Sequence, residues 1–76
     1  MYVWKSIGAL KVGECFKFDL DDRFEFKLLD VEEITEDIIV VNCKATKNRY
    51  KYDRYETFKG KVLKSLAVFV KSNRPL

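Results

Sequence analysis

The chain has 76 residues, of which 47% are hydrophobic and 36% charged, with a net charge of +3 and no histidine. This length allows one domain with one small core, and the mixture of apolar and charged residues excludes a disordered chain. We therefore expect a single domain over residues 1–71 and a frayed tail over residues 72–76.

Two runs of alternating apolar and polar residues, 15–20 and 24–28, are the clearest local signal. Each run places three large apolar side chains on one face and charged side chains on the other, as in a half-buried antiparallel strand. The polar break over residues 21–23 has the length of a hairpin loop, so the sequence predicts a β-hairpin here. Its apolar face consists of Phe16, Phe18, Leu20, Phe24, Phe26 and Leu28.

The alternation breaks at Leu28 and Leu29, because Leu29 and Val31 fall on the formerly polar face. Such a break predicts a β-bulge or a sharp bend. The acidic stretch over residues 32–37 indicates a loop or a turn. Residues 38–43 are rich in β-branched side chains and apolar on both faces, which predicts the central and most buried strand.

The last third of the chain is less regular. Residues 46–48 predict a turn, and residues 49–55 alternate as in a further strand. Val62, Leu63, Leu66 and Phe69 or Val70 fit a short helical stripe, whereas Leu66, Val68 and Val70 fit a strand, and residues 59–61 suggest a turn before them. Residues 67–70 favour a strand, because the run is apolar and partly β-branched.

Five short antiparallel strands in a chain of this size have one economical arrangement, a sheet that curls and so protects its edges. The predicted fold class is therefore all-β, either a small five-stranded curled sheet or a closed barrel, with a short helix near 57–65 as an addition. The expected core is Phe16, Phe18, Phe26, Leu28, Val40 and Val68.

The segment Leu10-Lys11-Val12-Gly13-Glu14-Cys15-Phe16 resembles the opening of small SH3-like barrels. In those domains a Lys-x-Gly-acidic turn precedes a strand whose second residue is a large hydrophobe. The resemblance covers about seven residues, and it implies a fold rather than a function, since such barrels carry many unrelated binding roles.

Catalytic and metal chemistry find little support in the sequence. Without histidine, a Ser-His or Cys-His pair cannot form, and the paired carboxylates fall in predicted turns. Two isolated thiols, Cys15 and Cys43, cannot supply the four ligands of a zinc site. We expect both thiols to be reduced and dispensable for function, because both lie in apolar runs where nothing lowers their pKa toward reactivity. We therefore expect no enzyme and no cofactor.

The sequence shows neither a secretory signal nor an apolar run long enough to cross a membrane. We accordingly expect a cytoplasmic protein that does not insert into membranes.

The charges are distributed unevenly along the chain. Through residue 43 there are five lysines and arginines against ten acidic residues, a net charge of −5. From residue 44 onward there are ten against two, a net charge of +8. An asymmetry of this kind indicates a recognition surface.

The basic half interleaves cations with tyrosines, and this combination suits nucleic acid. Cations follow the phosphates while flat rings stack on bases, each stacked ring contributing ~1–3 kcal/mol. We therefore expect residues 44–64 to bind DNA or RNA with little sequence specificity. The alternative for the tyrosines is an ordinary strand that covers the core beside a solvated cationic face. The candidate site residues are Lys44, Lys47, Arg49, Tyr50, Lys51, Tyr52, Arg54 and Tyr55.

A second hypothesis is a small regulator that binds a host protein, as phage-encoded inhibitors do. Its acidic loops over residues 19–25 and 32–37 would contact a basic partner, with exposed aromatic residues as anchors. The anchors would be Tyr2, Trp4, Tyr55 and Phe58. A homodimer is a third possibility, because the core is small.

Overall fold

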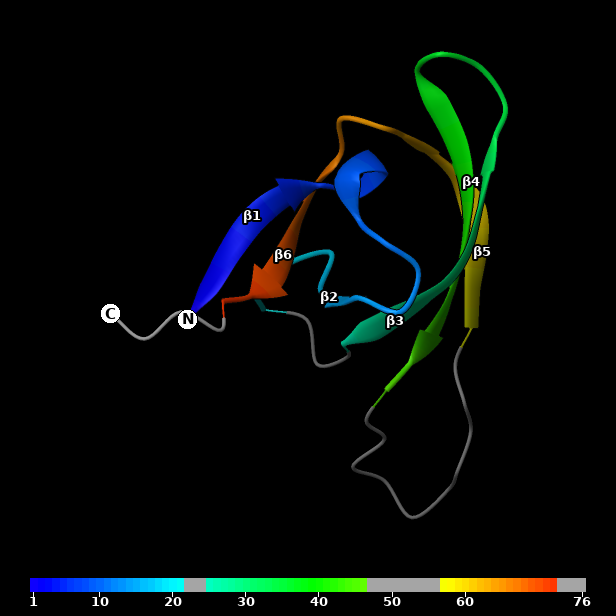
Figure 1. Ribbon diagram of the computed structural model, residues 1–76. Coiled ribbons are helices and arrows are strands. Elements are labelled where there is room, and N and C mark those ends of the chain that lie inside the picture. The colour runs from blue at the N-terminus through cyan, green and yellow to red at the C-terminus, as the bar shows by residue number, and fades with distance from the viewer. Residues whose placement is uncertain (22–24, 47–56, 73–76) are drawn as a thin grey trace.

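Four antiparallel strands form a curled sheet, and two more form a ribbon that packs across its hollow side (Figure 1). The computed structural model describes residues 1–21, 25–46 and 57–72. The all-β class and the curled antiparallel sheet are thus confirmed, with six strands in the described residues. In chain order the elements are β1 (Tyr2–Ser6), the 3-10 turn η1 (Ile7–Ala9), β2 (Cys15–Phe16), β3 (Phe26–Glu33), β4 (Ile38–Ala45), β5 (Thr57–Leu63) and β6 (Ala67–Lys71).

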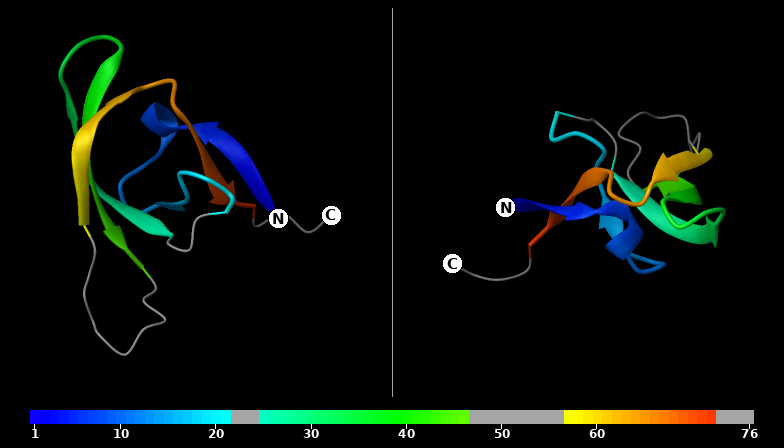
Figure 2. Two further views of the ribbon diagram at one scale, coloured as in Figure 1. Left: turned by 180° about the vertical axis from the view of Figure 1, so that it is seen from behind. Right: turned by 90° about the horizontal axis from the view of Figure 1, so that it is seen from above.

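The curled sheet has the order β2-β3-β4-β5, and the ribbon consists of β1 and β6. Lys17 and Phe69 join the two sheets, because each backbone N–H donates to the carbonyl of the other at 2.8 Å. At the other end the N–H of Gly8 in η1 donates to the Lys64 carbonyl at 3.0 Å. A Cβ atom at Gly8 would lie 2.9 Å from the Cβ of Lys64, so this close approach requires glycine. Figure 2 shows the half-open barrel that results.

The predicted bulge is confirmed. Leu28 pairs with Cys43 and Asp30 pairs with Asn42, which leaves Leu29 as the extra residue of β3. A bulge bends its strand and increases the local twist. It therefore accounts for part of the curl, and it exchanges the faces of β3 as the sequence break indicated.

The core lies between the curled sheet and the ribbon. Phe16, Leu28 and Val68 are fully buried, as expected, while Phe18 and Phe26 are partly buried and pack against the core. Val40 was wrongly assigned to the core. The odd-numbered residues of β4 face inward instead. The sequence could not show this, because the strand is apolar on both faces and alternation cannot select one of them. The inward side chains of β4 are Ile39, Val41, Cys43 and Ala45.

The predicted first strand over 15–20 is shorter than expected. After Phe16 the chain leaves β3, because Lys17 pairs with Phe69 of β6 instead. Leu20 is consequently 51% exposed rather than part of the apolar face. β1 was not predicted from the sequence, because it has no alternating apolar face. Its pairing depends on β6, which lies at the other end of the chain.

Residues 57–65 contain no helix and no turn at 59–61, since β5 pairs with β4 over its whole length. Phe58 and Gly60 share the inner face of β5, and a Cβ at Gly60 would lie 3.0 Å from Cζ of Phe58. The ring of Phe58 thus covers the glycine and reaches Phe18, with ring centroids 5.2 Å apart. Glycine is tolerated within this strand because an aromatic ring fills the space beside it.

The facing of β4 can be tested with two neighbouring isoleucines. Ile39 is 1% exposed, whereas the adjacent Ile38 is half-buried on the outer face. We expect Ile39→Ala to lower the free energy of unfolding by ~2–5 kcal/mol, because it leaves a cavity in the core. The matched variant Ile38→Ala should cost less than half as much. Urea denaturation measures both, and equal costs would contradict the assignment of faces.

Candidate nucleic-acid interface

One of the eight predicted site residues, Lys44, lies in the described part of the chain, on β4. The other seven fall outside the described residues, as does the predicted strand over 49–55. These seven are Lys47, Arg49, Tyr50, Lys51, Tyr52, Arg54 and Tyr55. Because Lys44 pairs with Thr57, the two strands that precede and follow residues 47–56 in the sequence, β4 and β5, meet at one end of the sheet.

Lys44 lies on the outer face of the curled sheet beside a second lysine. It pairs directly with Lys27 of β3, and directly opposed residues of an antiparallel pair project to the same face. Lys27 is exposed and Lys44 is half-buried. The pair therefore concentrates positive charge on this face.

The outer face of β5 extends this positive charge. Lys59 pairs with Asn42 and Lys61 pairs with Val40, and both lysines are exposed. Lys44, Lys59 and Lys61 therefore lie on one face, together with Lys27. We define these four residues as the outer lysine group. Lys64, which follows β5, donates instead to Oε1 of Glu33 at 3.1 Å.

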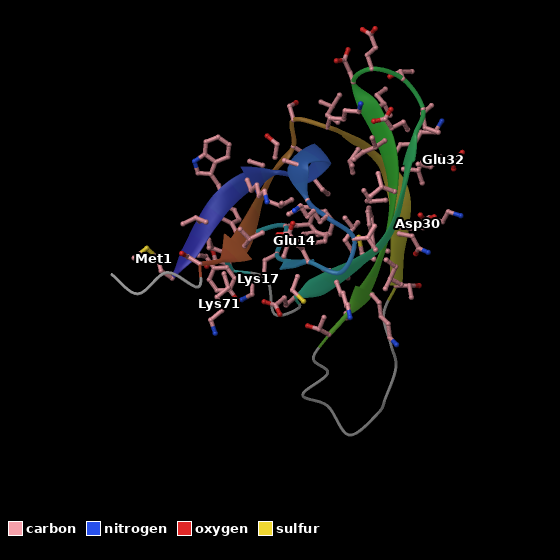
Figure 3. The ribbon with its side chains drawn as sticks, viewed as in Figure 1. Met1, Glu14, Lys17, Asp30, Glu32 and Lys71 are labelled. Atoms are coloured by element: carbon pink, nitrogen blue, oxygen red, sulfur yellow. The ribbon has the colours of Figure 1, made fainter. Side chains whose placement is uncertain are left out.

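Acidic residues occupy the other side of the same face. Asp30 and Glu32 of β3 stand in the same cross-strand rows as Lys59 and Lys61, with β4 between them. Figure 3 shows Asp30 and Glu32 directed away from the interior. Strands lie about 4.8 Å apart, so the two carboxylate positions are about 10 Å from the lysine positions. The uneven charge of the sequence thus places acidic residues on β3 and basic residues on β5, on either side of β4.

Lys27 was not predicted as a site residue, because it lies in the acidic half of the sequence. Its position beside Lys44 depends on the register of β3 against β4, which the bulge sets. The alternation of Glu25 and Lys27 indicated an outward side chain, yet no local pattern shows which residue of β4 it would meet.

The two cysteines are free thiols, with Cys43 buried in the core and Cys15 half-buried on β2. Burial raises the pKa of the Cys43 thiol to about 11. Burial also raises the pKa of Cys15, with a smaller contribution from the charge of Glu25. Both thiols are therefore protonated near neutral pH, where the thiolate is the reactive form.

The exposed aromatic residues expected at an interface differ in their surroundings. Trp4 is 70% exposed and Phe58 is 37% exposed, whereas Tyr55 lies outside the described residues. Tyr2 is partly buried. Its hydroxyl donates to Glu25 Oε2 at 3.3 Å, and Lys17 Nζ lies 5.0 Å from its ring centroid. Burial raises the pKa of the Tyr2 hydroxyl, and the negative charge of Glu25 raises this pKa further.

Within residues 1–21, 25–46 and 57–72, no three metal-ligating side chains gather into a group. The same residues include no helix long and apolar enough to span a membrane. No protein-family model, curated protein or solved structure matches the chain.

Proposed function

We propose that this protein binds nucleic acid with little sequence specificity, through residues 44–64 and the outer lysine group. The observation that supports the proposal best is the opposed pair Lys27 and Lys44, with Lys59 on the next strand. This arrangement gathers cations from three strands on one face, and a phosphate chain could contact them together. The proposal includes no catalysis and no cofactor.

The position of the tyrosine-rich segment in the chain favours a single strand. Residues 47–56 connect the ends of β4 and β5, next to Lys44 and Thr57. Cations of the outer face would follow the phosphates, and tyrosines of the segment would stack on unpaired bases. Asp30 and Glu32 repel phosphates from β3, so the backbone of the nucleic acid would follow β5 rather than cross the whole sheet.

We also propose that the half-barrel is a variant of the SH3-like barrel. The turn before β2 supports this, because Gly13 has a φ of 96° and the Lys11 N–H donates to Glu14 Oε1 at 2.8 Å. Phe16, the second residue of β2, is fully buried. Glycine is favoured at a positive φ, and a large hydrophobe after the acidic turn fills the core.

The double variant Lys59→Glu/Lys61→Glu tests the proposed surface. We expect it to bind a fluorescent single-stranded oligonucleotide at least tenfold more weakly, measured by anisotropy. The dependence of log affinity on log salt should flatten by about 1.4, because two phosphate contacts are lost. The control Lys11→Glu/Lys71→Glu changes the net charge equally, and Figure 3 places Lys71 far from Asp30 and Glu32. Equal losses in the two variants would contradict a localised site.

A second candidate function is a regulator that binds a basic protein surface through the β3–β4 turn. Figure 1 shows this hairpin extending beyond the rest of the fold. Ile34 is 45% exposed there, among the exposed acids Glu33 and Glu36, and an open depression of about 370 Å³ lies between these residues and Lys64. Capture of a protein from host lysate that persists after nuclease treatment would favour this candidate.

A further inference from the structure

Among residues 1–21, 25–46 and 57–72, the ribbon has an open edge along β1. The Ser72 N–H donates to the Met1 carbonyl at 2.7 Å, and the Ile7 N–H donates to the Leu66 carbonyl at 2.8 Å. Opposed residues of an antiparallel pair alternate between bonded and unbonded positions. The odd-numbered residues Val3 and Lys5 therefore bond to β6, while the N–H and C=O groups of Tyr2, Trp4 and Ser6 point away from it.

The backbone hydrogen bonds on the other side of β6 agree with this alternation. Phe69, the partner of Trp4, exchanges both of its backbone hydrogen bonds with Lys17. Phe69 therefore turns its polar groups away from β1. Among the described residues, no strand pairs with the open side of β1. Figures 1 and 2 agree in showing β1 as the outer strand of the ribbon.

The β1 edge carries one lysine and no proline or bulge, so it has few of the features that normally prevent strand addition. Edge strands are protected by charged side chains, prolines, bulges or short length. The single charged residue of β1 is Lys5, whose Nζ lies 3.5 Å from Oε1 of Glu14. The edge of the curled sheet at β5, in comparison, carries two exposed lysines, Lys59 and Lys61, on its outer face. Trp4 is 70% exposed and Val3 is 43% exposed on the β1 edge.

From these observations we infer that the β1 edge binds a second copy of this chain, with the two β1 strands antiparallel about a twofold axis at Trp4. The open backbone groups belong to residues 2, 4 and 6, a set that is symmetric about residue 4. In this register Trp4 bonds to Trp4 of the second copy, and Tyr2 bonds to Ser6 at each end. All six open N–H groups of the two strands then find an acceptor, and closed twofold pairing is the commonest form of oligomer.

The side chains fit the same register. Trp4 and its cross-strand neighbour Phe69 share the outer face, so the dimer places two tryptophans side by side between two phenylalanines. On the opposite face Lys5 meets Val3 of the second copy, so no like charges oppose each other. A second copy fits better than an acidic or phosphate-bearing partner, because Lys5 is already paired with Glu14. This inference does not depend on the proposed function.

Ser6→Pro tests the register with little effect on the monomer. Ser6 has φ −66° and ψ 134°, which proline adopts, and its N–H is not used by β6. Trp4→Glu is a second variant, which places two carboxylates at the twofold axis. Ser6→Ala keeps the N–H and serves as the control. Circular dichroism checks that each variant is folded.

Sedimentation equilibrium between about 10 μM and about 1 mM should show the average mass rising from 9.0 kDa toward twice that value. Emission of Trp4, the one tryptophan, should shift to shorter wavelength in parallel. Ser6→Pro and Trp4→Glu should weaken association at least tenfold, and Ser6→Ala should not. If Ser6→Pro fails to fold, the association of Trp4→Glu decides whether the dimer forms through β1.

A wild-type protein that stays monomeric at about 1 mM would overturn the inference. Association that both variants retain would also overturn it, because the interface would then lie elsewhere. A Trp4 emission shift caused by oligonucleotide, without any increase in protein mass, would assign the edge to nucleic acid instead. Failure of oligonucleotide binding alone would affect the proposed function and leave the dimer intact.

Discussion

Truncation of Phe16 to alanine is expected to lower the free energy of unfolding by ~3–5 kcal/mol. Phe16 is fully buried, and its ring packs edge-on against Phe18 with centroids 5.1 Å apart. It also faces Phe26 at 6.3 Å, so the substitution removes the centre of an aromatic cluster. A domain of this length has a total stability of roughly 4–11 kcal/mol, so the loss should take at least about a quarter of it and lower the melting temperature markedly.

Phe58→Ala is the matched control for this prediction. Phe58 joins the same cluster from its rim, through Phe18, and is 37% exposed. We expect its truncation to cost about 1–2 kcal/mol, because water already reaches much of the ring. Thermal melts followed by circular dichroism compare the two. If both variants melt together with the wild type, the aromatic cluster does not stabilise the fold.

Charge reversal within the tyrosine-rich segment should have the largest effect on binding. In the variant Lys47→Glu/Arg49→Glu/Lys51→Glu, three cations become anions, and we expect binding of single-stranded oligonucleotides to be abolished at moderate salt. Each neutralised phosphate contributes about 0.7 to the slope of log affinity against log salt. Loss of three contacts should therefore flatten the slope by about two, in any residual binding at low salt.

Tyr50→Leu and Tyr52→Leu separate stacking from charge. Replacing a ring that stacks on a base should cost ~1–3 kcal/mol of binding free energy without changing the salt slope. Anisotropy titrations at several salt concentrations distinguish the two effects. If the triple variant binds with the wild-type slope, the segment does not contact phosphates.

The sequence predicted the fold class and several strands because their signals are local. Alternation marked the start of β3, β-branched residues marked β4, and the break at Leu28 and Leu29 marked the bulge. The length of β2 and the existence of β1 depend on partners distant in the chain, Phe69 above all. The inward face of β4 could not be chosen, because Val40 and Val41 are both apolar and β-branched.

The candidate site was predictable to a smaller degree. The clustering of cations after residue 43 was visible in the sequence, and the register of β4 against β5 places Lys44 and Lys59 on one face. The contribution of Lys27 was not visible, because it depends on a bulged register across two strands. The separation of acidic β3 from basic β5 arises in the same way, since charge along a sequence does not specify the order of strands.

Titration of the wild-type protein into a fluorescent single-stranded oligonucleotide, at several salt concentrations, tests the proposed function most directly. We expect measurable binding at moderate salt, with log affinity falling linearly against log salt by about 0.7 for each phosphate contacted. Binding no tighter than ~100 μM to any single- or double-stranded oligonucleotide would contradict the account, since that is the weak end of ordinary nonspecific binding. The regulator that binds a basic protein through the β3–β4 turn would then be the better explanation.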